Sequence, residues 1–342
     1  MEYSLVKTVV QRLMLMAIII LGVVTIMFIL SRVLPGSPAE LMLGGHPTAA
    51  QLAKAEEELG LNKPLLVQYV DYVAQIARGD FGNSLRTGQP VITEIANRVG
   101  ATLELTTLAI LLVMLLGIPL GVLSAVRQNS AIDNVARAVA VAGVAIPSFM
   151  LAIVLQLVFF GVLKWLPLQG RIDPVVAIDA PIEPITRFYL LDALLTGNWA
   201  GFMSALAHLA LPLATLTILL LATVVRITRN MMVEVLKEGY IRTAFAYGLP
   251  RSSIYYRHAL KATLIPILTV IGLTYGNLLS GAIVVEFIFD WPGLGGFLVF
   301  SLIENDFPAA IGTTLFLAGL YLTINLVVDL LYAVVDPRLR TS

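Results

Sequence analysis

The chain of 342 residues contains no cysteine, and only 13% of its residues are charged. The absence of cysteine excludes a disulfide framework, a thiolate metal site and a cysteine nucleophile. A soluble domain carries about 25% charged residues, whereas 58% of this chain is hydrophobic. The shortage of charge therefore indicates an integral membrane protein. The net charge is zero, which gives no reason to expect a nucleic acid as a partner.

Catalytic and nucleotide-binding motifs are also missing. The histidines, His46, His208 and His258, lie far apart, and none has a second metal ligand four residues away. No G-x-x-x-x-G-K-[ST] phosphate loop occurs, so the chain lacks this route to ATP binding. We therefore expect no metal, no cofactor and no enzyme activity in this chain. If ATP drives the protein, another polypeptide must bind it.

Long apolar stretches dominate what is present. A helix needs about 20 mostly apolar residues to cross a hydrocarbon core of about 30 Å. Six stretches meet or approach this length, which predicts an all-α membrane protein with six transmembrane helices. We expect the first to be retained, because no small-residue cleavage site follows it. The predicted spans are Leu13–Leu30, Thr102–Leu123, Val135–Leu157, Leu206–Val225, Leu264–Val285 and Ile311–Leu331.

Basic residues set the expected orientation of these spans. Seven Lys and Arg residues lie within 226–261, after the fourth span, whereas the last outer loop, Glu286–Ala310, has none. Because cytoplasmic loops carry an excess of Lys and Arg, we expect both termini in the cytoplasm. The predicted division is a first span (1–30), an extracytoplasmic helical loop (31–100) and a core of five spans (101–342), which includes an extracytoplasmic loop (164–205) and a cytoplasmic loop (226–263).

The interiors of the predicted spans contain no ionisable residue in mid-membrane. Proton-driven and ion-driven carriers usually keep such residues at depth, so their absence argues against that class. Uncharged polar residues do occur and are candidates for a translocation path. Hydrogen bonding between membrane helices is the commoner role of such residues. The candidates are Thr269, Thr274, Asn277 and Ser280.

The outer loops have helix signals of their own. Thr48 and Gln51 have the spacing of a capping box, which predicts a helix over Gln51–Leu59. A second helix is expected from Pro64 to just before Gly79, and an amphipathic segment over Ile185–Leu195. Two interpretations remain open. These segments either lie on the membrane surface or receive a soluble partner.

The cytoplasmic loop shows an ordered helical pattern. We predict short helices over Met231–Gly239 and Ile241–Tyr247, with the second ended by Gly248. Ser252 or Ser253 is expected to cap the helix that enters the fifth span. The orientation rule alone accounts for the basic residues of this loop, but it does not account for the helix–glycine–helix pattern. A docking element for an external partner accounts for both.

Several segments along nearly the whole chain carry a family resemblance. Each is weak alone, whereas their order and spacing together are specific. The chain resembles permease subunits of the ATP-binding-cassette importers for dipeptides, oligopeptides and nickel. The matching segments are Arg32–Pro38, Gly79–Ser84, Arg98–Leu105, Tyr240–Leu249, His258–Leu260, Glu286–Gly295 and Asp336–Arg338.

The resemblance implies a type I importer permease with six spans in a bacterial inner membrane, surrounded by lipid. It implies a second homologous permease, two ATPase subunits that bind ATP and Mg²⁺, and an extracytoplasmic substrate-binding protein. In this family a cytoplasmic coupling helix seats in a groove of the ATPase. The residues that correspond to it are Glu238, Gly239, Tyr240, Arg242, Thr243, Ala244, Phe245, Ala246, Tyr247 and Gly248.

This chain departs from the family pattern at three positions. Phe245 and Tyr247 stand where the peptide branch usually has Arg and Lys, and Ser37 stands where Asp is frequent. We therefore expect a more apolar ATPase groove. Di- or oligopeptides are the expected cargo, with nickel or another peptide-like solute as the alternative. From a different class, a self-contained channel or ion-driven carrier remains an alternative, and no catalytic set supports a membrane enzyme.

Overall fold

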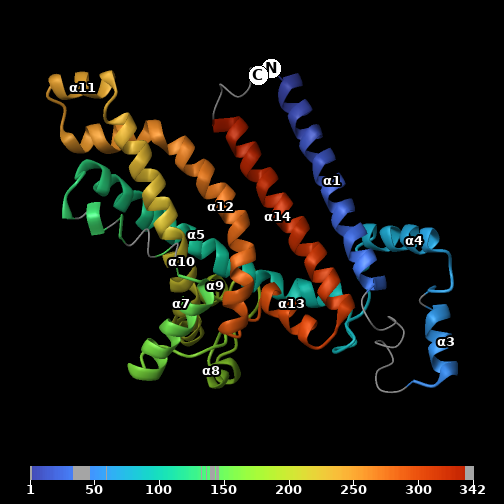
Figure 1. Cartoon of the computed structure of the whole chain (residues 1–342). Helices are drawn as coiled ribbons and strands as arrows, with labels where there is room; N and C mark the ends of the chain where they lie inside the picture. The colour runs from blue at the N-terminus through green and yellow to red at the C-terminus, as the bar shows by residue number, and fades with distance from the viewer. Residues whose placement is uncertain are drawn as a thin grey trace. The chain divides into compact units, whose positions relative to one another are not determined.

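The computed structural model describes residues 2–33, 47–58, 60–131, 133–135, 137–138, 143 and 146–335. Ser37, His46 and the Asp336–Arg338 segment lie outside these residues. The described chain is built from helices (Figure 1). They are α1 (Glu2–Val33), α3 (Ala49–Glu58), α4 (Leu65–Ala77), α5 (Val91–Val126), α7 (Ser148–Leu155), the π-helix η1 (Gln156–Val162), α8 (Pro174–Asp179), α9 (Tyr189–Leu195), α10 (Trp199–Val235), α11 (Gly239–Ala246), the π-helix η2 (Ser253–Ala259), α12 (Leu260–Ile288), α13 (Leu294–Ile303) and α14 (Phe307–Val335).

Five of these helical stretches are long and apolar enough to cross a membrane, which confirms the all-α membrane architecture. The third predicted span, Val135–Leu157, lies partly outside the described residues. From Ser148 onward it belongs to the shorter apolar helix Ser148–Val162. The number of six spans therefore stays a prediction. The five stretches are Val9–Ser31, Val91–Val126, Trp199–Val235, Ser253–Ile288 and Phe307–Val328.

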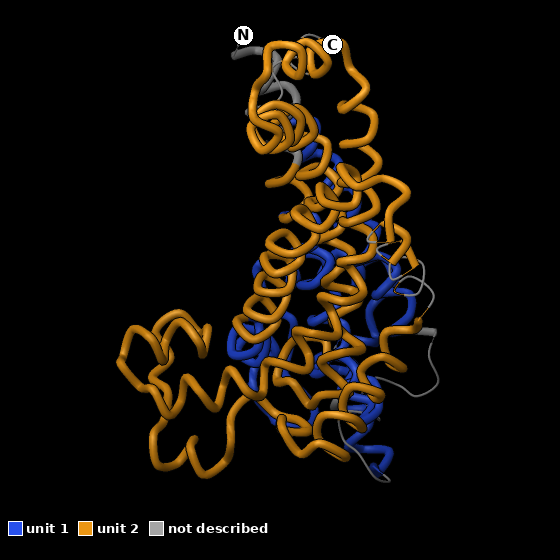
Figure 2. The backbone as a smooth tube through the Cα atoms, turned by 90° about the vertical axis from the view of Figure 1, so that its left-hand side faces the viewer, with its two compact units in different colours: residues 1–99, 296–323 blue, residues 100–295, 324–342 orange. Residues whose placement is uncertain are grey.

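The chain forms two compact units, which Figure 2 colours blue and orange. Unit 1 comprises residues 1–99 and 296–323, and unit 2 comprises residues 100–295 and 324–342. This grouping is by contact, whereas the predicted division of the chain is by side of the membrane. That division stays a prediction.

In unit 1, α4 packs against α1 through aromatic side chains. The Phe28 and Tyr69 ring centroids lie 5.4 Å apart, and the Tyr69 hydroxyl lies 2.7 Å from Thr25 Oγ1. The predicted capping box begins α3, since the Thr48 amide donates to Gln51 Oε1 over 2.9 Å. The helices predicted after Thr48 and after Pro64 are thus confirmed as α3 and α4.

A buried carboxylate organises the Gly79–Ser84 motif of unit 1. Asp306, between α13 and α14, accepts hydrogen bonds from the Ser84 hydroxyl at 2.5 Å and the Leu85 amide at 3.1 Å. Gly312 on α14 lies close to Phe81, and a Cβ there would come within 2.9 Å of the Phe81 Cβ. The motif therefore folds a loop onto the start of α14.

In unit 2, α10 is the central helix and packs against α7, α9 and α12. It contains 37 residues, or about 55 Å at about 1.5 Å per residue. A helix of that length extends well beyond a hydrocarbon core of about 30 Å. One end of unit 2 carries α11, and the opposite end carries α8 and α9 (Figure 1).

Candidate coupling hairpin

The candidate site is the hairpin of residues 236–252, which joins α10 to the helix that continues into α12. The prediction of a separate helix over Met231–Gly239 is wrong, because α10 continues to Val235 and the chain turns only at 236–238. No Gly or Pro interrupts α10 after Val225, and Met232 extends its buried face. The predicted serine cap is also absent, since Ser252 is already helical and its side chain caps nothing.

The helix predicted over Ile241–Tyr247 is present as α11 (Gly239–Ala246). Ile241 is completely buried, and Ala244 is nearly so, at 9% exposed. Both belong to an apolar cluster that also contains Met232 of α10 and Ile254 of η2. Two positions one turn apart thus anchor α11 to the two helices that it connects.

Gly248 ends α11 in a left-handed conformation, with a φ of +74°. The Gly248 amide donates to the Phe245 carbonyl at 3.0 Å, and the Leu249 amide donates to the Ala244 carbonyl at 3.3 Å. This pair of bonds is the Schellman motif, in which glycine avoids the Cβ strain of the left-handed region. Pro250 follows, so the chain cannot continue the helix. The sharp end of α11 is therefore encoded locally.

The remaining faces of α11 point outward. Tyr240, Phe245 and Tyr247 are 49%, 42% and 83% exposed, and Leu249 is 40% exposed. Desolvation, followed by the charge of Glu238, raises the pKa of the Tyr240 phenol above its ordinary value. Tyr240 and Phe245 flank the buried Ile241–Ala244 side of α11, and Tyr247 and Leu249 follow its C-terminal end. We call these four side chains together the aromatic face. Exposed basic residues flank it, namely Arg242, Arg251 and Arg257.

The two alanines of the predicted coupling segment differ in position. Ala244 packs into the cluster of the chain itself, whereas Ala246 is exposed. Thr243 is exposed, and its hydroxyl donates to the Gly239 carbonyl at 3.1 Å. Only Ala246 of the pair is therefore available for close approach by another protein.

At the opposite end of unit 2, two of the segments that carry the family resemblance meet. Trp291 is 2% exposed, and its Nε1 donates to the Ala101 carbonyl at 3.0 Å. The Leu294 amide donates to Thr102 Oγ1 at 2.8 Å. Gly295 approaches the buried Glu286 and donates its amide to Glu286 Oε2 at 2.6 Å. The Arg98–Leu105 and Glu286–Gly295 segments thus meet and fasten α5 to the end of α12.

A buried ion pair lies at the same end of unit 2. We call the side chains that meet here the aromatic knot, namely Thr102, Glu104, Arg171, Tyr189, Glu286 and Trp291. Arg171 Nη2 lies 2.5 Å from Glu104 Oε2 and donates to the Arg187 carbonyl at 2.8 Å. The Arg171 guanidinium also stacks over the Tyr189 ring, 3.7 Å from its centroid. The spacing of the sequence does not reveal this pair, because its members lie 67 residues apart.

Comparison with known proteins decides the family. Residues 117–341 match the family described as "Binding-protein-dependent transport system inner membrane component", and residues 5–106 match its N-terminal counterpart. The chain belongs to this family. It is a multi-pass inner membrane permease and, as such a component, is not itself an enzyme.

Curated relatives agree over nearly the full length of the permease. The probable D,D-dipeptide transport system permease protein DdpB of Escherichia coli (strain K12) is 45% identical over 96% of both chains. The dipeptide transport system permease protein DppB of Alkalihalophilus pseudofirmus is 40% identical over 96% of this permease and 98% of the relative. The DppB protein of Escherichia coli (strain K12) is 39% identical over 96% and 97%.

The four candidate translocation residues of the permease all lie on α12. The Thr269 and Thr274 hydroxyls donate to the carbonyls of Ile265 and Val270, at 2.9 and 2.6 Å. Asn277 and Ser280 are exposed, together with other side chains at helical spacing. This exposed stripe of α12 comprises Leu273, Asn277, Ser280, Val284 and Phe287.

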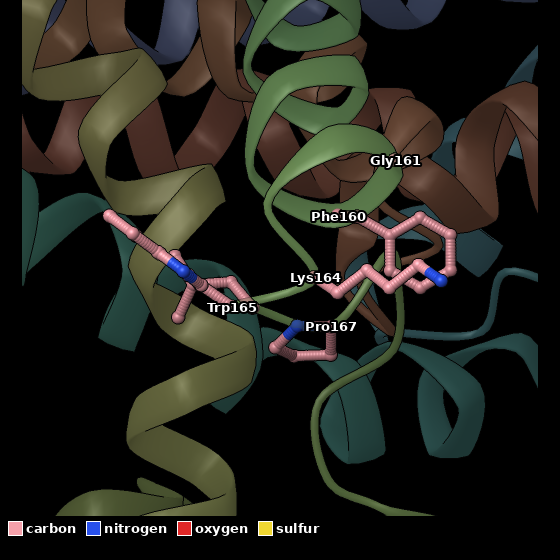
Figure 3. Close-up of a pocket in the computed structure, with 6 residues that line it drawn as sticks. Phe160, Gly161, Lys164, Trp165 and Pro167 are labelled. Carbon is pink, nitrogen blue, oxygen red and sulfur yellow. The ribbon is translucent and has the colours of Figure 1, made fainter.

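A cavity of about 440 Å³ opens where η1 ends. Its lining is apolar apart from Lys164, whose side chain runs past Phe160 while Trp165 points the other way (Figure 3). Trp165 is 70% exposed. An exposed Trp and Lys at the end of an apolar helix are typical of the membrane–water interface.

One buried charge near the hairpin has no counterpart in the sequence expectations. Asp133 is completely buried, and Arg229 of α10 approaches it with two nitrogens. In the sequence Arg229 counts only among the basic residues that set the orientation, and nothing there marks Asp133. The hydrogen bond from Arg229 is the main cause that lowers the pKa of Asp133.

Proposed function

We propose that the permease forms half of the substrate pathway of an ATP-driven importer for di- or oligopeptides. A second homologous permease completes the pathway, and two ATPase subunits bind ATP and Mg²⁺ and hydrolyse the nucleotide. An extracytoplasmic binding protein delivers the substrate. Membership of a binding-protein-dependent family supports the general assembly, and the names of the relatives support the substrate class.

The aromatic face of the hairpin is the observation that carries this proposal. It consists of exposed side chains that flank the buried side of α11, which Ile241 anchors, and that follow the end of this helix, which Gly248 fixes. Exposed apolar patches rimmed by polar residues mark interaction sites. The chain is a component of a binding-protein-dependent transport system and has no phosphate loop of its own, and we assign an ATPase subunit as the partner of the hairpin.

The hairpin would work as a lever. Coupling requires the ATPase to hold it differently in its two nucleotide states. The buried anchors of α11 would pass its displacement to α10 and α12. The residues that we assign to this role are Glu238, Gly239, Tyr240, Arg242, Thr243, Ala244, Phe245, Ala246, Tyr247 and Gly248, with Ala244 acting inward and the aromatic face acting outward.

The exposed stripe of α12 is the candidate wall of the pathway. Asn277 and Ser280 present polar groups there, whereas Thr269 and Thr274 bond to their own helix. A largely uncharged wall suits a solute that the binding protein has already selected. In this arrangement the hairpin and both termini face the cytoplasm, as the distribution of basic residues predicts.

Transport by the reconstituted complex tests the proposal. The permease is purified with its associated subunits and incorporated into liposomes with ATP on the ATPase side. Uptake is then compared for L-alanyl-L-alanine, D-alanyl-D-alanine and Ni²⁺. We expect ATP-dependent uptake of at least one dipeptide. Uptake of Ni²⁺ alone would change the substrate class and leave the coupling mechanism intact.

A second arm addresses the self-contained channel or carrier. Liposomes that contain the purified permease alone should show no flux of either dipeptide. Flux without ATPase subunits, with no further gain from ATP, would reject an ATP-driven importer. The nearly uncharged span interiors of the sequence favour the first outcome.

A further inference from the structure

Asp133 joins three segments of unit 2 through one buried carboxylate. Its Oδ1 accepts from Ser124 Oγ at 2.6 Å, at the end of α5, and its Oδ2 accepts from the Asn129 amide at 3.0 Å, in the following turn. Arg229 of α10 donates from Nε to Oδ1 at 2.5 Å and from Nη2 to Oδ2 at 2.9 Å. The carboxylate therefore has donors on both oxygens and links α5, the turn and α10.

We call the Asp133–Arg229 pair the clamp. Its hydrogen bonds fix the orientation of both side chains. A guanidinium that bonds both oxygens of a carboxylate fixes the orientation of both groups, unlike a single point charge. Asn129 has a φ of +62°, so the turn is held in the left-handed region that Asn tolerates. Arg137 Nε lies 3.7 Å from Asp133 Oδ2 and is itself half exposed, so it adds a weaker contact.

The clamp lies against the same apolar cluster as the hairpin. Val122 and Ala125 of α5 are buried in one cluster with Met232, Ile241 and Ala244. The helices α5 and α10 also approach closely. A Cβ on Gly121 would come within 2.5 Å of the Thr228 Cβ. Arg229, which follows Thr228, holds the carboxylate about two turns before α10 ends at Val235.

Energetics indicate what such a pair contributes. A buried ion pair often adds little net stability, because desolvation of the two charges offsets their attraction. What it supplies is one defined arrangement, since any other leaves a buried charge without its partner. The forked bond therefore adds a directional contact between α5 and α10 to the packing of the apolar cluster.

We propose that Asp133 and Arg229 are positioning residues that make the 127–130 turn, the end of α5 and the hairpin move as one body. Movement of the hairpin then reaches α5 as well as the two helices that the hairpin joins. This inference rests on the proposed coupling function and adds a second route by which the hairpin drives the spans.

The coupling ratio, dipeptide transported per ATP hydrolysed, tests the clamp in the reconstituted complex. Arg229→Gln removes the charge and the fork. Arg229→Lys keeps the charge and removes the fork. Both should lower the ratio clearly below the wild-type value, because each variant loses the fork that bonds both carboxylate oxygens. Arg226→Gln is the matched control, because Arg226 is exposed on the same helix, and it should keep the wild-type ratio.

A double substitution tests whether Asp133 and Arg229 act as one unit or through two independent contacts. Asp133→Asn with Arg229→Gln should lower the ratio no further than either change alone, because residues that act together are not additive. Wild-type ratios in Arg229→Lys would overturn the proposal, and so would full additivity. If Arg229→Gln fails to assemble with the ATPase, Arg229→Lys decides the outcome by the same criterion.

A distance measurement tests the one-body claim without any substrate. Because the chain has no cysteine, spin labels can be placed at Gln128→Cys and Lys237→Cys, both exposed positions. The distance distribution should be narrow in the purified permease and broad in Arg229→Gln and Arg229→Lys, but not in Arg226→Gln. An unchanged distribution in both Arg229 variants would overturn the inference. If the wild-type complex shows no ATP-dependent uptake of a dipeptide, that result would instead count against the proposed function.

Discussion

At the hairpin end of unit 2 the Tyr247 side chain is 83% exposed, whereas at the opposite end the Trp291 side chain is 2% exposed. Both aromatics lie in segments that carry the family resemblance. The Trp291 indole donates to the Ala101 carbonyl and belongs to the buried core. In the hairpin, Ile241 and Ala244 are buried and anchor α11, whereas the rings of the aromatic face are exposed. Burial thus places the motif residue Trp291 in the fold of the knot, whereas the exposed Tyr247 is free to contact a partner, as the proposed coupling function requires.

The largest loss of stability is expected at the knot. Trp291→Ala removes a buried aromatic side chain and its hydrogen bond to Ala101. Changes of this kind cost about 3–5 kcal/mol. The thermal unfolding midpoint of the purified permease should fall clearly, as measured by fluorescence-detected gel filtration after heating. Trp165→Ala is the control, since Trp165 is 70% exposed and its loss should leave the midpoint almost unchanged.

A slightly smaller loss is expected from Glu104→Leu. The change leaves Arg171 as a buried charge without its carboxylate, which costs about 3 kcal/mol. We expect the lower end of the range, because Arg171 keeps the Arg187 carbonyl and the Tyr189 ring. The same heating assay measures the effect.

The double variant of Glu104→Leu and Arg171→Met sharpens this comparison. Replacing both members of a buried pair by apolar groups is often nearly neutral. The double variant should therefore unfold at a higher temperature than Glu104→Leu alone. A lower midpoint in the double variant would mean that Arg171 contributes mainly through its carbonyl and ring contacts.

The contrast also shows what the sequence could predict. Apolar runs predicted five of the long helices, and Thr48 with Gln51 predicted the start of the first outer helix, because these signals are local. Gly248 predicted the end of α11 for the same reason. The continuation of α10 to Val235 was missed, because a helix without a stop signal continues past its apolar run.

The spacing of residues along the sequence does not predict contacts between residues that are far apart in the chain. The Glu104–Arg171 and Asp133–Arg229 pairs join residues 67 and 96 positions apart. Trp291 could be quoted only as part of a family motif, with no partner assigned. The predicted coupling residues were found as one run, but only the fold shows that Ala244 faces inward and Tyr247 outward.

A moderate change in stability with a large change in coupling is expected from Gly248→Val. A β-branched residue at a φ of +74° costs about 1–2 kcal/mol in the left-handed region. A Cβ there meets no atom within 4 Å, so the strain is confined to the backbone. The end of α11 should fray, and the ratio of dipeptide transported to ATP hydrolysed should fall.

Two control variants identify the cause. Gly319→Ala, on α14 and outside the hairpin, also adds a Cβ into open space, but at a glycine without positive φ, and should preserve coupling. Gly248→Asn should be tolerated better than valine, because Asn enters the left-handed region more readily. Normal coupling in Gly248→Val would refute the assignment of the hairpin end to the coupling element.

The smallest effect on stability is expected at the aromatic face itself. Tyr247→Ala removes a side chain that contacts solvent over most of its area, and such surface changes usually stay within about 0.5 kcal/mol. The heating assay should therefore not distinguish this variant from the wild type. Co-purification of the ATPase subunits should nevertheless fall, because exposed aromatic residues are frequent anchors of protein interfaces. Phe245→Ala should act in the same direction but with some loss of stability, since its ring lies 6.3 Å from that of Tyr255. If Tyr247→Ala lowers the unfolding midpoint and leaves ATPase binding intact, Tyr247 stabilises the fold and does not bind the partner. The proposed contrast between Trp291 and Tyr247 would then be wrong.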